Sequence, residues 1–120
     1  MIIDLATTYG ACRNTVRYVC ETTKATAASV DYTYPIEDGD LVQRFRDAVE
    51  KETREGRIVR VAIIDTVVAN PGVRMPFEML TQACRELGVM SLIDGAHGVG
   101  HIDLDLTVLD PDFFVSNCYK

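Results

Sequence analysis

The chain has 120 residues, of which 48% are hydrophobic and 25% are charged, and its formal net charge is -6. This length is enough for one domain with one modest core. The acidic balance argues against nucleic acid or an anionic membrane as a partner, because both require clustered lysine and arginine. No apolar run approaches the roughly 20 residues that span a membrane, and the first residues lack the basic region of a signal peptide.

The four cysteines, Cys12, Cys20, Cys84 and Cys118, contain no Cys-x-x-Cys pair. Without such a pair or a secretory context, we predict reduced thiols in the cytoplasm, with no disulfide framework and no metal site. We expect Cys84 to lie in the core and Cys118 to be a packed thiol rather than a nucleophile.

The first half of the chain predicts two strands and two helices. An apolar run at residues 1–5 predicts a strand, and residues 8–22 have helical spacing. Residues 29–34 alternate and are rich in β-branched and aromatic side chains, which predicts a second strand. Asp40 and Gln43 form a capping-box pattern, so we expect Asp40 to begin the second helix.

The second half continues this alternation. The nearly continuous apolar run at residues 58–64 is typical of a strand that is buried on both faces. A helix is predicted from Pro76 to the residue before Gly88, and further strands are predicted at residues 89–93 and 112–116. Strands that alternate with helices indicate an α/β fold, of the three-layer α/β/α type with a mostly parallel sheet.

Polar residues follow three of the predicted strands. Ligands of such sheets bind beyond the carboxyl ends of the strands, which points to Asp65, Asp94 and residues 117–120. An aspartate and a lysine at neighbouring strand ends, with a histidine nearby, suit pyridoxal phosphate. The amine of Lys120 would form a Schiff base with the cofactor aldehyde, and Asp94 would keep the pyridine nitrogen protonated.

Spacing alone leaves a second interpretation open. Asp94 could be an ordinary capping residue after a strand, and Lys120 a solvated surface side chain. Gly95 and Ala96 are small, so we expect a bulky group to approach the backbone there.

Two runs of sequence carry a resemblance to a known family. Residues 92–103 read Leu-Ile-Asp-Gly-Ala-His-Gly-Val-Gly-His-Ile-Asp, and residues 109–120 read Leu-Asp-Pro-Asp-Phe-Phe-Val-Ser-Asn-Cys-Tyr-Lys. They resemble the class V aminotransferase family of fold type I pyridoxal-phosphate enzymes, which carries Asp-Gly-Ala-His, then Asp-Phe, then a His-Lys pair. The Asn-Cys at residues 117–118 and the run at residues 71–78 look most like isopenicillin N epimerase-like proteins and fungal hercynylcysteine sulfoxide lyases.

The resemblance implies a role for four residues. Asp94 would bind the pyridinium nitrogen, His97 would hydrogen-bond the phenolic oxygen of the ring, and Lys120 would form the Schiff base. Tyr9 stands where the family places a His or Tyr beside the ring, so it could stack on the ring or supply a proton. The alternative for Tyr9 is a core or turn tyrosine.

The chain departs from the family pattern near the cofactor phosphate. Tyr119 stands where the family usually has a histidine, and a phenol carries no positive charge at neutral pH, so we expect weaker phosphate binding. Asn117 could contribute an amide. Ala69 occupies a position where related enzymes have a Ser or Asn side chain.

The resemblance further implies that residues 1–120 are part of a pyridoxal-phosphate-binding large domain that is truncated at both ends. The expected function is that of a pyridoxal-phosphate enzyme acting on an amino acid, with a C–S lyase for a cysteine derivative as the specific case. A homodimer is expected at full length. The alternative is an inactive fragment that keeps the fold and half of the cofactor site. A nucleotide-binding module is disfavoured, because it would need a glycine-rich loop after the first strand, and residues 5–10 contain one glycine, Gly10.

Overall fold

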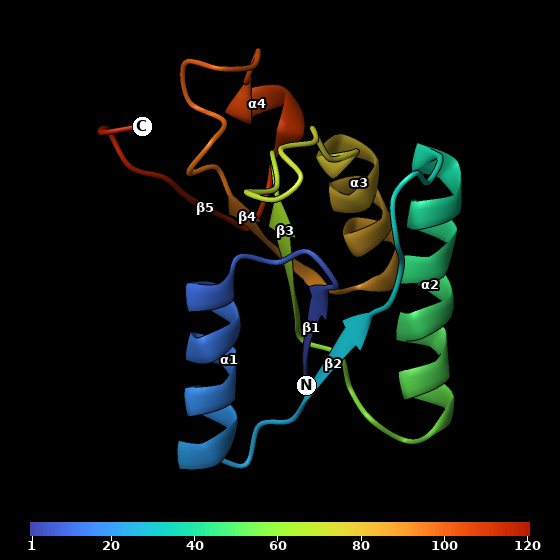
Figure 1. The fold of residues 1–120 in the computed structure, drawn as a ribbon. Coiled ribbons are helices and arrows are strands. Elements are labelled where there is room, and N and C mark those ends of the chain that lie inside the picture. The colour runs from blue at the N-terminus through green and yellow to red at the C-terminus, as the bar shows by residue number, and fades with distance from the viewer.

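The computed structural model describes all 120 residues and forms one parallel sheet with helices on both faces (Figure 1). In chain order the elements are β1 (Ile2–Leu5), α1 (Gly10–Thr22), β2 (Ala27–Val30), α2 (Asp38–Arg54), β3 (Val61–Asp65), α3 (Phe77–Leu87), β4 (Met90–Asp94), α4 (Leu106–Leu109) and β5 (Phe113–Val115). The strand order is β2-β1-β3-β4-β5, and every pairing is parallel. With α1 on one side of the sheet and α2 and α3 on the other, the predicted three-layer α/β/α fold is confirmed.

The main core lies between the sheet and helices α2 and α3. Ile64 of β3 and Ile93 of β4 are opposite each other in the strand register and are 0% exposed. They belong to one buried cluster with Phe45 of α2 and Leu80 of α3. Burial of one such side chain stabilises the fold by about 1.5–3 kcal/mol. Because α1 buries only Val16, the layer formed by α2 and α3 contributes most of this stabilisation.

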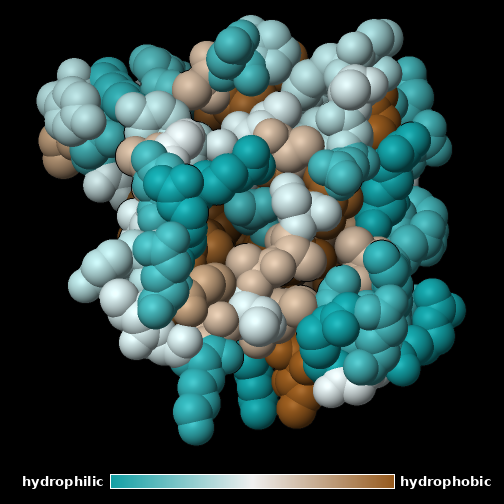
Figure 2. Space-filling view, turned by 60° about the horizontal axis from the view of Figure 1, so that its bottom comes forward, coloured by the Kyte–Doolittle hydropathy of each residue, from teal (hydrophilic) through white to brown (hydrophobic).

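The opposite face of the sheet, toward α1, is only partly covered. Asp65 and Asp94 lie on this face, as do Met90, Phe113 and Val115, which are 42%, 51% and 49% exposed. With the bottom of Figure 1 brought forward, hydrophobic residues reach the surface in a hollow that hydrophilic residues border (Figure 2). Because Phe113 and Val115 are half exposed, the edge strand β5 presents the kind of surface that promotes association between chains. No helix in the structure combines the length and the apolar composition that a membrane crossing requires.

Strand β2 is shorter than the sequence predicts. The prediction of a strand over residues 29–34 is wrong for residues 31–34, because the structure ends β2 at Val30. The only partner of β2 is β1, whose last residue, Leu5, lies opposite Val30. Beyond this pair there is no neighbouring backbone to continue the ladder, so the alternating pattern of residues 31–34 continues outside the sheet.

Helix α2 begins two residues before the predicted cap. Asp40 lies inside its first turn together with Asp38, where negative charge interacts favourably with the helix dipole. The expected capping box does not form, because the side chain of Gln43 donates to Asp47 Oδ1 at 2.8 Å instead. The structure also contains the short helix α4, which the sequence pattern does not predict.

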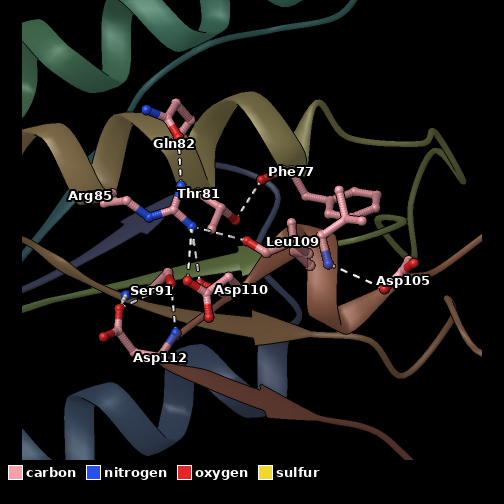
Figure 3. Close-up of polar contacts among 10 residues, drawn as sticks. Phe77, Thr81, Gln82, Arg85, Ser91, Asp105, Leu109, Asp110 and Asp112 are labelled. Atoms are coloured by element: carbon pink, nitrogen blue, oxygen red, sulfur yellow. Dashed lines mark hydrogen bonds and ion pairs between the residues drawn. The ribbon is translucent and has the colours of Figure 1, made fainter.

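Polar contacts from α3, α4 and β4 hold the chain that leads into β5 (Figure 3). The Asp105 side chain caps α4. Arg85 of α3 donates to the backbone oxygen of Leu109 at 3.2 Å. Asp112 Oδ2 accepts from the backbone nitrogen of Ser91 at 2.8 Å, and the Ser91 hydroxyl accepts from the backbone nitrogen of Asp112 at 3.1 Å. This reciprocal pair places β5 beside β4 and directs residues 116–120 to the carboxyl end of the sheet.

Candidate functional site

Asp94 ends β4 with its carboxylate held in a defined orientation. Its Oδ1 accepts from the backbone nitrogen of Ala96 at 2.9 Å, and its Oδ2 accepts from the Cys12 thiol at 3.4 Å. Its backbone oxygen accepts from the backbone nitrogen of Thr66 at 2.9 Å and from the Thr66 hydroxyl at 3.1 Å. The residue is 9% exposed. Contacts on both oxygens fix the carboxylate without neutralising its charge, which leaves it able to pair with a cation.

Asp65 ends the neighbouring strand β3, in direct register with Asp94. It is 4% exposed, and its Oδ2 has no hydrogen-bond partner. Burial, and then the nearby charge of Asp94, raise the pKa of the Asp65 carboxyl to about 7. Two carboxyl groups therefore share this end of the sheet, and that of Asp65 has one oxygen that accepts no hydrogen bond.

A small pocket lies where the carboxyl ends of β3 and β4 meet the amino end of α1 and the last residues of the chain. We call it the strand-end pocket. It is lined by Tyr9, Asp65, Val67, Ala69, Asp94, Ala96, His97 and Lys120. The amine of Lys120 lies 5.6 Å from the centre of the Tyr9 ring, within the range of a cation–π contact. The pocket thus combines an amine, an aromatic ring and two carboxyl groups from segments that are far apart in the sequence.

The structure brings four of the six predicted site residues, Tyr9, Asp94, His97 and Lys120, to the strand-end pocket. It places Asn117 and Tyr119 outside the pocket lining. Tyr119 is 81% exposed, while Asn117 is partly buried and its Oδ1 has no partner.

The second histidine and two of the cysteines lie outside the strand-end pocket. His101 is exposed and its ring contacts the backbone oxygen of His97. Cys84 is 0% exposed, which confirms its predicted place in the core. Cys118 is exposed, so the expectation of a packed thiol there is wrong. The reason is that Cys118 follows the end of edge strand β5, where no further layer covers the chain.

The small residues after Asp94 serve internal packing. A Cβ atom added at Gly95 would lie 2.1 Å from Cζ of Phe114, and one added at Gly98 would lie 2.8 Å from the hydroxyl of Thr66. The expectation that Gly95 makes room for a bulky ligand is therefore wrong, because Phe114 of the adjacent strand already occupies that space.

Two contributors to the site are not recognisable from sequence spacing. Cys12 reaches Asp94 from 82 positions away. Burial and the hydrogen bond to Asp94 raise the pKa of the Cys12 thiol to about 11, so the thiol stays protonated and donates. The role of Thr66 in holding the Asp94 backbone also depends on strand pairing. A lone cysteine or threonine in sequence carries no indication of such contacts.

The side chains that line the strand-end pocket suit the chemistry of the pyridoxal phosphate ring better than that of its phosphate. Asp94 supplies a fixed carboxylate for a ring nitrogen, Tyr9 an aromatic face, and Lys120 a primary amine. Beside these groups, the buried Oδ2 of Asp65 is a hydrogen-bond acceptor that has no donor. Tyr119, which the family pattern places near the phosphate, lies outside the pocket lining, and its phenol carries no positive charge at neutral pH.

The sequence profile of the family described as Aminotransferase class-V matches residues 9–120. The chain therefore belongs to the class V aminotransferase family, as its motifs predict.

Curated relatives agree with this assignment. The chain is 39% identical over 120 residues to the L-cysteine desulfhydrase-like protein lolT1 of Epichloe uncinata, covering 100% of the chain and 26% of that protein. It is 32% identical over 121 residues to a probable chloroplastic L-cysteine desulfhydrase of Arabidopsis thaliana, covering 99% and 26%. It is also 38% identical over 61 residues to the hercynylcysteine sulfoxide lyase of Schizosaccharomyces pombe, covering 51% and 16%. The chain spans about a quarter of the length of the first two relatives.

Solved structures of pyridoxal-phosphate enzymes share the fold. A mutant of C-DES with glycine covalently linked to the PLP cofactor superposes with a TM-score of 0.81 at 19% identity, covering 96% of this chain and 29% of that one. The complex of the cystine C–S lyase C-DES with cysteine persulfide gives a TM-score of 0.78 at 18% identity, with coverage of 96% and 30%. At this identity the likeness establishes the fold alone.

Proposed function

We propose that this chain is part of the cofactor-binding large domain of a pyridoxal-phosphate enzyme that acts on an amino acid, with a cysteine-derived C–S compound as substrate. The observation that carries the proposal is the strand-end pocket, where Tyr9, Asp94 and Lys120 meet in a chain of the class V aminotransferase family. The C–S substrate is supported by relatives named L-cysteine desulfhydrase and hercynylcysteine sulfoxide lyase.

Bound pyridoxal phosphate supplies an electron sink for the substrate α carbon. Asp94 would accept a hydrogen bond from the ring nitrogen, and the contacts of its carboxylate with Ala96 and Cys12 keep it in place for that bond. The Lys120 amine would hold the cofactor aldehyde until the substrate amine takes its place, and the freed Nζ would then accept the proton from the substrate α carbon.

The remaining predicted residues have supporting roles in this proposal. Tyr9 would cover one face of the ring, and His97 would contact its phenolic oxygen, since both line the strand-end pocket. Asn117 and Tyr119 would lie toward the phosphate. Neither side chain is cationic at neutral pH, so they would contribute hydrogen bonds without full charge neutralisation.

Reductive trapping tests the cofactor site. The chain has three lysines, Lys24, Lys51 and Lys120. Borohydride reduction after incubation with pyridoxal phosphate, followed by peptide mapping, should label Lys120 preferentially. The matched control is Lys24→Ala, which should leave labelling unchanged, whereas Lys120→Ala should abolish the preferred label. Equal labelling of all three lysines would refute a specific site.

A second candidate is binding without turnover. The strand-end pocket groups Tyr9, Asp94 and Lys120, but neither Asn117 nor Tyr119 lines it, so residues 1–120 provide half of the cofactor site. Sulfide release from L-cysteine, measured with the cofactor-loaded chain, separates the two candidates. Release above that of Lys120→Ala supports the enzyme, and specific Lys120 labelling without release supports the binding unit.

We also propose a homodimer and a cytoplasmic location. The half-exposed Phe113 and Val115 of edge strand β5 support the dimer, because they offer an apolar contact surface. The four free cysteines support a reducing compartment. Sedimentation velocity and cell fractionation test the two proposals.

A further inference from the structure

One ionisable group of the strand-end pocket, Asp65, has no part in the proposed reaction. Asp65 is 4% exposed, lines the pocket beside Asp94, and leaves Oδ2 without a partner. A buried carboxylate that lacks a partner is strongly unfavourable, so such a group gains a partner or takes up a proton. The buried, unpartnered oxygen therefore favours the protonated form of Asp65.

The charges that act most strongly on Asp65 are those of two carboxylates and one guanidinium. Asp94 of β4 and Asp4 of β1 both disfavour its ionised form, while Arg13 of α1 favours it. Arg13 is already engaged, because it contacts Asp4 at 3.5 Å and donates to the backbone oxygen of Leu5 at 2.8 Å. The other titratable groups that face this region are Cys12, Tyr32, Tyr34, and the pocket residues Tyr9, His97 and Lys120.

Only one of the two strand-end carboxyls is readily ionised in such an environment. When two carboxyl groups share a site, the charge on one disfavours the charge on the other. Asp94 has a hydrogen-bond donor on each oxygen, and Asp65 has an unpartnered oxygen. The geometry therefore assigns the charge to Asp94 and the proton to Asp65. A cation placed against Asp94 would offset the second of the two causes that disfavour ionised Asp65, the charge of Asp94, while burial would remain.

We propose that Asp65 is a positioning residue of the cofactor site, which holds a proton while Asp94 has no cationic partner and releases it when a protonated ring nitrogen binds Asp94. The O–H bond of Asp65 breaks, its electron pair stays on the carboxylate, and the proton passes to water. The second negative charge then helps retain the cationic ring. This inference rests on the proposed function, since it requires pyridoxal phosphate to bind at Asp94.

The test follows the Asp65 carboxyl directly by ¹³C NMR on the 120-residue chain labelled in its aspartates. Without ligand, Asp65 should titrate with a midpoint pH of about 7. With saturating pyridoxal phosphate the midpoint should fall by about 1 to 3 pH units, the usual effect of an adjacent opposite charge. The matched ligand is the carbon analogue in which C–H replaces the ring nitrogen, and it should leave the midpoint near its ligand-free value.

The pH dependence of cofactor affinity distinguishes the proposed proton release by Asp65 from a purely structural role. Because the proposed binding releases a proton, the affinity of the wild-type chain for pyridoxal phosphate should increase with rising pH. The increase should be up to about tenfold per pH unit and should end near pH 7. Asp65→Asn should lack this component of the pH profile. Asp31→Asn is the matched control, since Asp31 is an exposed aspartate that follows strand β2 and lies outside the strand-end pocket. It should keep the wild-type profile.

The possible outcomes separate this inference from the proposed function. If Lys120 is labelled specifically but the Asp65 midpoint does not fall, the inference is overturned and the proposed function stands. If both ligands lower the midpoint equally, the dependence on the ring nitrogen is overturned. An Asp65 that is already ionised at pH 5 without ligand also overturns it. Absence of specific Lys120 labelling refutes the proposed function, and the inference with it.

Discussion

Asp65 and Asp94 end adjacent parallel strands in direct register, and both line one pocket at the carboxyl end of the sheet. Neighbouring side chains in register point to the same face, so this pairing places two carboxyl groups together by backbone geometry alone. The two carboxyl groups have different hydrogen bonding. Both oxygens of Asp94 accept hydrogen bonds, whereas Oδ2 of Asp65 has no hydrogen-bond partner.

The stability of the chain should fall as pH rises from about 4 to 7 because of Asp65. Its pKa is raised from 3.8 to about 7 in the folded state, so over this range the folded chain binds more protons than the unfolded chain. The contribution is fully present below pH 4 and is lost above pH 7, with an upper bound of about 4 kcal/mol at roughly 1.4 kcal/mol per pH unit. Urea unfolding of the wild type and of Asp65→Asn at pH 5 and pH 8 measures it. The variant should show a smaller loss between the two pH values, and an equal loss would contradict the assignment.

Replacement of Asp94 should weaken binding of pyridoxal phosphate much more than replacement of an exposed aspartate. Asp94→Asn keeps the shape of the side chain but removes the charge that pairs with the ring nitrogen. A charged hydrogen bond contributes about 1.5–3 kcal/mol, which corresponds to an affinity loss of roughly 10- to 150-fold. Fluorescence titration provides the dissociation constants. Asp103→Asn, an exposed control, should bind as the wild type does, and a loss below twofold for Asp94→Asn would argue against this role.

Gly95→Ala should destabilise the fold, because the new methyl group would meet the ring of Phe114 at 2.1 Å. Overpacking of this kind costs about 1–3 kcal/mol. Gly10→Ala is the matched control, since Gly10 begins α1 and has nothing within 4 Å of its added Cβ. Thermal unfolding of both variants should show a loss only for Gly95→Ala. Addition of Phe114→Leu should restore part of the loss, and no restoration would mean that the strain lies elsewhere.

Asp112→Asn should loosen the attachment of β5. The carboxylate of Asp112 accepts from the backbone nitrogen and the hydroxyl of Ser91 (Figure 3). Loss of these charge-assisted bonds should cost about 1–3 kcal/mol. Asp110→Asn is the control, because the side chain of Asp110 is 81% exposed and its contact with Arg85 is long, at 3.7 Å. Hydrogen exchange should accelerate at the Ser91 amide in Asp112→Asn and remain slow in Asp110→Asn.

The cysteines should react with iodoacetamide in an order that the structure sets. Cys118 is exposed and should be alkylated early. Cys12 should react slowly at pH 8, because burial and Asp94 raise its thiol pKa to about 11 and only the thiolate is nucleophilic. Cys84 is buried and should react only after unfolding. Mass spectrometry of peptides taken over time shows the order, and early alkylation of Cys12 would contradict its bond to Asp94.

Several features of the fold follow from the sequence by itself. Apolar runs and helical spacing locate the alternation of strands and helices, because burial imposes a period on each type of element. The Asp94 and Lys120 motifs identify the family, and their positions after predicted strands place them at one edge of the sheet. These features depend on neighbours that are close in the sequence, which is why patterns in the residues are sufficient to find them.

Only the tertiary structure decides the rest, because it depends on which segments meet. The end of β2 is set by the length of its partner β1, and the need for Gly95 is set by Phe114 on the next strand. The thiol of Cys12 becomes a donor to Asp94 only when α1 packs beside β4. The raised pKa of Asp65 arises from burial and from the charge of Asp94, and neither exists until β3 and β4 are paired.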